Sequence, residues 1–231
     1  KNEFLKSIDL DEKFLDPHKN LFKLNFKLKD YKSAIENGKN VIKLEPTKNP
    51  LSYFNLALAY DFSNDFKNAI DLYKIVETLN FKEKKILFNN LARCYLNKNN
   101  IVEAKNYYQK ALEFDQNDKV ILNNLLILYL KIGDKDKSEY FYKKAKAIDE
   151  NYIEFRLNKS EYFLSKKDHQ KSIEILKSII NETKNHIAYS KLAKIYSIIN
   201  DKKKVKETIE EALSIYPNRE DFKLSKGFLH L

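Results

Sequence analysis

One packing pattern recurs six times along this chain at an almost constant spacing. Each copy is centred on a residue that is small in five of the six cases. Successive centres lie 35, 35, 34, 34 and 33 residues apart. They are Ala34, Ala69, Ala104, Ser138, Ser172 and Val205. A fixed period of this size is typical of stacked supersecondary units, none of which buries its apolar face alone. The period therefore predicts an array of such units rather than one globular core.

The columns on either side of each centre have the periodicity of α-helices. Twelve and nine residues before the centre, most copies carry a small residue and an aromatic one, as at Ala92 and Tyr95. Four and seven residues after it, most copies carry a large and then a small or β-branched residue, as at Tyr108 and Ala111. Spacings of three and four place such residues on one helix face. Each copy is therefore predicted to be a helical hairpin with its tyrosines in the core.

The break between the two predicted helices is equally regular. Most copies place a residue that tolerates left-handed backbone five positions before the centre, and Asp or Asn follows it. The first column reads Lys29, Asn64, Asn99, Gly133, Lys167 and Asn200, and the second reads Asp30, Asp65, Asn100, Asp134, Asp168 and Asp201. A left-handed residue ends one helix, and the side chain of Asp or Asn caps the next.

These residues resemble the tetratricopeptide repeat, in which leucine, a small residue, tyrosine, alanine, an aromatic residue and a second alanine recur at these offsets. The best-matching copy carries Leu91, Ala92, Tyr95, Ala104, Tyr108 and Ala111. The resemblance covers nearly the whole chain. It implies an all-α fold, a right-handed superhelix of about six tandem helix-turn-helix units with partial repeats at both ends. The fifth copy departs most, because Arg156, Lys159 and Ser160 occupy packing positions and Leu157, Phe163 and Leu164 look rephased.

Alignment of the copies predicts the repeat boundaries. A single array over 1–231 would contain full repeats at 14–48, 49–83, 84–118, 119–151, 152–184 and 185–218. Residues 1–13 match the end of a preceding repeat, and residues 219–231 match the first helix of a further one. The sequence contains no Met, so we expect a piece of a longer protein. Phe4, Phe222 and Phe228 are expected on apolar surfaces left exposed at these ends, where self-association is a further expectation.

The composition favours a binding module over an enzyme. The formal net charge is +10, but only three of the 43 basic residues are Arg, the residue that phosphate and base recognition favours. Cys94 is the only cysteine and is expected to be a packing residue, and the four His lack metal-ligand spacing. Neither a phosphate-binding glycine loop nor a nucleophile motif occurs. We therefore predict no catalytic residue, metal or cofactor.

The resemblance also implies where a partner binds. In the family, the first helices line a concave groove, and at its sixth position this chain carries Asn in five of six repeats. A side-chain amide both donates and accepts, so it suits any peptide backbone. The predicted groove residues are Phe54, Asn55, Leu58, Asn89, Asn90, Arg93, Asn123, Asn124, Ile127, Lys131, Asn158, Lys191 and Lys194. Two alternatives stay open: each amide bonds within its own repeat or meets water, and the apolar residues pack against the adjacent repeat.

Three functions are compatible with this sequence. The leading hypothesis is a non-catalytic scaffold or adaptor that binds an extended or helical, acidic segment of a partner protein. The chain is also compatible with an assembly or regulatory arm of a larger enzyme or membrane machine. RNA binding by a helical repeat is a weaker alternative. Docking of a chaperone's C-terminal Glu-Glu-Val-Asp tail is not expected, because Lys23, Ile86 and Asn90 do not fit the residues that such a clamp needs.

Overall fold

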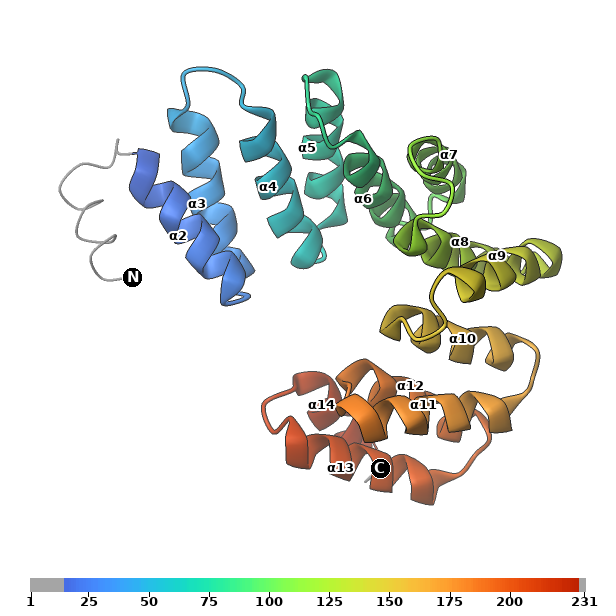
Figure 1. Cartoon of the computed structure of the whole chain (residues 1–231). Coiled ribbons are helices and arrows are strands. Elements are labelled where there is room, and N and C mark those ends of the chain that lie inside the picture. The colour runs from blue at the N-terminus through green and yellow to red at the C-terminus, as the bar shows by residue number, and fades with distance from the viewer. Residues whose placement is uncertain (1–14, 229–231) are drawn as a thin grey trace. The chain divides into compact units, whose positions relative to one another are not determined.

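The computed structural model describes residues 15–228, and all the regular structure in that range is α-helical (Figure 1). The predicted all-α class is confirmed. The thirteen helices of the described range are α2 (Leu15–Lys27), α3 (Tyr31–Leu44), α4 (Pro50–Phe62), α5 (Phe66–Thr78), α6 (Lys84–Asn97), α7 (Ile101–Leu112), α8 (Lys119–Ile132), α9 (Lys135–Ile148), α10 (Ile153–Ser165), α11 (His169–Thr183), α12 (His186–Ile198), α13 (Lys202–Ile215) and α14 (Glu220–Phe228).

These helices form two compact units that meet in sequence between Gln116 and Asn117. In the first unit, α2 packs on α3, α4 on α5 and α6 on α7. In the second unit, α8 packs on α9, α10 on α11 and α12 on α13, and α14 follows on α13. The predicted helix-turn-helix pairs are therefore present in each unit. We call the first helix of each pair the A helix and the second the B helix.

The turn inside every pair has the predicted conformation. All six residues of the first turn column have positive φ, from 60° to 63° at the five Lys and Asn residues and 79° at Gly133. Each Asp or Asn that follows accepts a hydrogen bond from the backbone N–H three residues later, as Asp30 does from Ser33 at 3.2 Å. These bonds satisfy N–H groups that a helix start leaves without partners.

Between paired helices, large residues lie against small ones. Tyr73, Tyr108 and Leu91 are at most 1% exposed, and Ala104 is fully buried. The contact is especially close at Gly38 of α3, where an added Cβ would lie 3.2 Å from the ring of Phe22 in α2 and 2.9 Å from Cδ1 of Leu56 in the next repeat. Most tyrosines of these columns are core residues, because an alanine or glycine opposite a ring lets the helix axes approach, whereas Tyr95 and Tyr142 are only half-buried.

The fifth repeat keeps the small contact but builds it from serines. Ser160 and Ser172 are 1% and 0% exposed, and the Ser172 hydroxyl donates to the Ser160 carbonyl at 2.8 Å. Of the residues expected to be rephased, Leu157 is buried whereas Phe163 and Leu164 are only partly buried. Two further side chains in α10 are buried that the pattern did not single out, Phe155 and Tyr162.

Phe222 corrects one expectation about the ends. We expected its ring on an exposed apolar surface, but it is 2% exposed and belongs to the core of the second unit. The reason is that α14 packs on α13, so its apolar side chain is covered there. Phe4, residues 1–13 and the side chain of Phe228 lie outside the part of the chain whose side chains are described.

Candidate protein-binding face

In the first unit, the A helices carry a small pocket on the face that they do not bury. The pocket has a volume of about 160 Å³ and lies where α2, α3 and α4 meet. Its walls include Leu51 and Asn55 of α4 and Lys19 and Lys23 of α2, with Gly38 in α3. Leu51 is 56% exposed, so apolar surface is open to solvent at the mouth. This combination suits one apolar side chain flanked by polar groups.

A buried carboxylate organises the rim of this pocket. Glu45 follows α3, and its side chain is 5% exposed. One of its oxygens accepts from Lys19 Nζ at 3.0 Å, Ser52 Oγ at 2.9 Å and Asn49 Nδ2 at 3.3 Å. All three donors also line the pocket. Glu45 therefore fixes one wall, because charge-assisted hydrogen bonds of this kind hold their donors in place.

A second buried carboxylate lies between the second and third repeats. Asp61 of α4 is 1% exposed, and it accepts from the Arg93 guanidinium of α6 and from the Tyr73 hydroxyl of α5. Burial raises the pKa of Asp61, although the Arg93 charge and donors from Cys94 and Tyr73 oppose that rise. Burial also raises the pKa of Tyr73, to which the neighbouring Asp61 charge contributes. The guanidinium lies over the ring of Phe62, 5.9 Å from its centroid.

The predicted asparagine column does not form one uniform surface. Asn55 is half-buried at the pocket, whereas Asn90 is 7% exposed and hydrogen-bonds to the Tyr73 hydroxyl. In the second unit, Asn124 and Asn158 are half-buried. The neighbouring Asn123 is 4% exposed, and its Oδ1 is buried without a hydrogen bond. Asn90 thus bonds to the preceding repeat rather than within its own repeat.

The other predicted groove residues divide in the same way. Phe54 is 7% exposed and stacks at 4.7 Å on Phe81 of its own repeat, so it is a packed residue rather than an open contact. The remaining predicted contacts are half-buried or exposed; they are Leu58, Asn89 and Arg93 in the first unit, and Ile127, Lys131, Lys191 and Lys194 in the second. Arg93 and Lys191 already form ion pairs inside their units, Lys191 with Glu161 at 2.6 Å.

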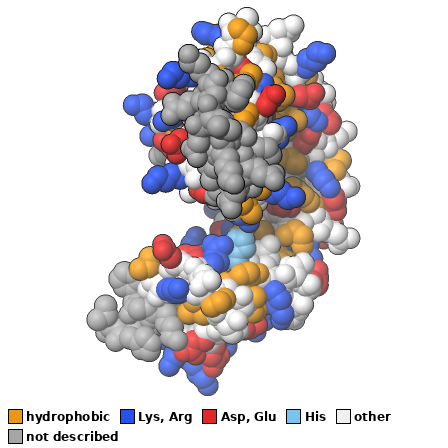
Figure 2. Space-filling model, turned by 90° about the vertical axis from the view of Figure 1, so that its left-hand side faces the viewer, with side chains coloured by type: hydrophobic (Ala, Val, Ile, Leu, Met, Phe, Trp, Pro, Cys, Tyr) orange, Lys and Arg blue, Asp and Glu red, His pale blue; other side chains and the backbone are white. Residues whose placement is uncertain are grey.

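The positive charge is distributed rather than gathered. On the face that Figure 2 shows, Lys and Arg side chains are interspersed with Asp and Glu over both units. Many described lysines pair with a carboxylate about one repeat away, as Lys85 does with Asp115 at 3.5 Å and Lys119 with Asp149 at 3.0 Å. Within residues 15–228, no group of three or more His, Cys, Asp or Glu side chains has the geometry of a metal site. Among the same residues, no helix has the length and apolarity to span a membrane.

The repeat pattern missed Glu45 and Asp61, because both fall outside the columns that define the hairpin. A usable signal was present, since several ion pairs join residues about thirty positions apart. Arg93 and Asp61 are separated by 32 residues, and Lys191 and Glu161 by 30. An acid and a base at nearly the repeat length lie on neighbouring A helices or on their flanks.

Comparison with known families identifies the repeat. Tetratricopeptide-repeat family models match residues 51–82, 86–118, 121–152 and 187–219, which together make up more than half of the chain. The chain therefore belongs to the tetratricopeptide-repeat family, whose arrays are generally protein–protein interaction modules. The unmatched stretches include the first and fifth repeats as we delimit them. No curated protein is significantly similar to the sequence.

Several solved structures share the fold. The chain is similar to a chain of the APC/C hetero-tetramer Cut9–Hcn1, with 14% identity and a TM-score of 0.70, over 98% of this chain and 44% of that one. A tetratricopeptide-repeat protein from Parabacteroides merdae is 19% identical with a TM-score of 0.62, over 85% of this chain and 79% of that one. YrrB, described as having an unusual peptide-binding site, is 18% identical with a TM-score of 0.54, over 80% of this chain and 94% of that one. The chain thus spans less than half the length of the matched chain of the Cut9–Hcn1 complex.

Proposed function

We propose that this protein is a non-catalytic scaffold that binds a peptide segment of a partner protein on the A-helix face of its first unit. The observation that carries the proposal is the pocket between α2 and α4. It brings together Leu51, Asn55 and Lys19, which lie in two successive repeats. A partner side chain would enter the pocket while its backbone hydrogen-bonds to the Asn55 amide.

The chemistry of the pocket favours an apolar residue next to an acidic one. Leu51, Phe22 and Val41 supply apolar contact. Lys23 is exposed at the mouth, whereas Lys19 is held by Glu45. An amide hydrogen bond contributes only about 0.5–1.5 kcal/mol net. Asn55 would therefore orient the segment, and burial of the apolar side chain would supply most of the affinity.

The test is a binding titration with a peptide selected from a random display library against this chain. We expect Leu51→Asp to weaken the affinity about tenfold or more, because it places a charge in the apolar mouth. Asn55→Ala should weaken it about two- to tenfold. Fluorescence anisotropy with the labelled peptide measures both effects.

Val102→Asp is a matched control. Val102 is 68% exposed and is the second residue of α7, as Leu51 is the second residue of α4. Both substitutions place a carboxylate in a first helical turn, where it suits the helix dipole. Affinity that is the same for Leu51→Asp and for the unmodified chain, with helicity intact, would show that the peptide binds elsewhere.

A further inference from the structure

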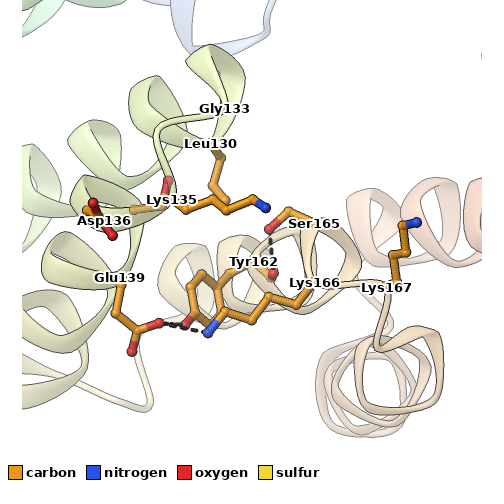
Figure 3. Close-up of a pocket in the computed structure, with 10 residues that line it drawn as sticks. Leu130, Gly133, Lys135, Asp136, Glu139, Tyr162, Ser165, Lys166 and Lys167 are labelled. Carbon is orange, nitrogen blue, oxygen red and sulfur yellow. Dashed lines mark hydrogen bonds and ion pairs between the residues drawn. The ribbon is translucent and has the colours of Figure 1, made fainter.

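The second unit contains a larger cleft that does not involve the predicted groove residues. It has a volume of about 660 Å³ and lies below the turn between α8 and α9, against the end of α10 (Figure 3). Its floor includes the buried residues Ser138 and Tyr162. Its walls are mostly exposed, and they include Lys135, Ser165 and Lys167. An open cleft with a buried floor fits a chain segment laid across it.

The cleft lies beside a fifth repeat whose A helix packs differently from those of the second, third and sixth repeats. In those repeats the A helix packs on the preceding B helix, as α4 does on α3, α6 on α5 and α12 on α11. Here α10 lies more extensively against α8 than against α9. Tyr162 fills part of the gap, and its ring stacks on Tyr142 of α9 with centroids 4.1 Å apart. The departure of α10 from the repeat pattern thus leaves open space beside α9.

Two acidic side chains line the cleft, Asp136 and Glu139, and Glu139 is already neutralised. Glu139 accepts from Lys166 Nζ at 2.7 Å and from the Tyr162 hydroxyl, and Lys143 lies 3.4 Å away. The Lys166 and Tyr162 donors hold the pKa of Glu139 at about 2. Its carboxylate is therefore charged but fully engaged, so it does not repel an incoming anion as a bare carboxylate would.

Unpaired lysines remain around the opening. Neither Lys135 nor Lys167 forms an ion pair with any residue of the described range. Figure 3 shows the Lys135 side chain extending across the cleft toward Ser165, with Asp136 at the opposite end of that lysine. The Ser165 hydroxyl donates to the Tyr162 carbonyl at 2.7 Å, which leaves its oxygen as an acceptor. The opening therefore offers a cation from α9 and a hydrogen-bond acceptor from α10.

We propose that this cleft is a second binding site, separate from the A-helix face, for an acidic peptide segment. A Glu or Asp side chain of the segment would bind the Lys135 ammonium, and a backbone N–H would donate to Ser165 Oγ. An adjacent apolar side chain would contact Leu130 and the Tyr162 ring. The site gives the protein a contact that a regular repeat does not have, and it does not depend on the first unit's pocket.

The experiment measures fluorescence anisotropy of a short fluorescein-labelled peptide of alternating Glu and Leu, titrated with the full chain. Lys135→Glu should weaken binding about tenfold and Lys135→Gln about threefold. Lys135 is the first residue of α9, where a carboxylate favours the helix, so the fold should be retained. The matched control is Lys203→Glu in α13, whose side chain is 87% exposed, and it should change affinity by less than about twofold.

Three outcomes would overturn the proposal. One is the absence of saturable binding of this peptide to the unmodified chain. Another is equal weakening by Lys135→Glu and Lys203→Glu, which would indicate attraction to net charge alone. The third is loss of binding in Leu51→Asp but not in Lys135→Glu, which would place the peptide on the A-helix face. A Gln–Leu peptide that binds as tightly as the Glu–Leu peptide would contradict the acidic specificity.

Discussion

The third and fifth repeats solve the same packing problem with different side chains. In the third, α6 and α7 meet through Leu91, Ala92 and Ala104, all fully buried. In the fifth, Ser160 and Ser172 occupy the two alanine columns and stay just as buried, with both hydroxyls bonded to backbone carbonyls. Side-chain size is therefore the property that the close contact requires, and polarity is tolerated where a carbonyl accepts the hydroxyl proton.

The leucine column, thirteen residues before each repeat centre, shows that a charged residue is tolerated in one core column. Five of the six repeats carry Leu there, but Lys159 stands where the third repeat has Leu91, and its ammonium pairs with Glu150 at 2.8 Å. Phe155 and Tyr162 of the same helix stay buried, as Leu87 and Cys94 do at the corresponding positions of α6. The comparison teaches that a repeat keeps its hairpin with a charge in one core column when the other columns of that helix still pack.

Shortening the side chain at the leucine position should give the largest difference in stability loss between the two repeats. Leu91→Ala removes a fully buried side chain and should lower the free energy of unfolding by about 2–5 kcal/mol. Lys159→Ala, at the same column, should change it by less than about 1 kcal/mol. Urea unfolding followed by circular dichroism measures both. Similar losses in the two variants would mean that Lys159 packs as a core residue.

Arg93 and Arg156 test the effect of burying a charge. Arg93→Ala leaves the buried Asp61 carboxylate without its cation, and we expect a loss of about 3 kcal/mol. Arg156 binds Glu182 through two nitrogens, at 2.6 and 2.7 Å, but that carboxylate is half exposed. Arg156→Ala should therefore lower Tm less than Arg93→Ala does. Asp61→Asn combined with Arg93→Ala should recover part of the loss, and an unchanged deficit would contradict the charge argument.

Exchange of alanine and serine between the repeats should have the smallest effect. Ser172→Ala removes one buried hydrogen bond and should cost about 1 kcal/mol. Ala104→Ser in the third repeat should cost no more than about 1 kcal/mol, provided that the new hydroxyl reaches the Ala92 carbonyl as Ser172 reaches Ser160. Hydrogen exchange of the amides in α7 and α11 reports each change locally. A loss of several kcal/mol in Ala104→Ser would show that the two contacts differ in geometry.

The sequence predicted the hairpins and turns well because both depend on local rules. Side-chain size at three- and four-residue spacing defines the packed face, and Asn64 or Gly133 marks a left-handed residue directly. Side-chain environments on the A helices were less predictable. Phe54 and Asn90 are predicted groove residues, yet Phe54 stacks on Phe81 and Asn90 bonds to Tyr73. These contacts join separate segments, within one repeat for Phe54 and between repeats for Asn90, and a single column does not show them.

The buried carboxylates and the cleft needed the structure for the same reason. Glu45 lies after α3 in a segment without a repeat column, and only the fold brings Lys19 and Ser52 to it. Lys159 signalled that the fifth repeat is irregular, but it did not show that α10 would lie against α8. Long-range pairing is set by the packing of whole helices, and a substitution at one position does not specify it.

The six turns have a consequence for how such a protein changes over generations. Each turn is closed by its own backbone, as when the N–H of Asp30 donates to the Asn25 carbonyl, and its cap comes from the residue that begins the next helix. Nothing in that geometry depends on which hairpin precedes or follows. A gene could therefore gain or lose one such module by recombination and leave every remaining bend intact, so length is the property that selection adjusts most easily in this architecture.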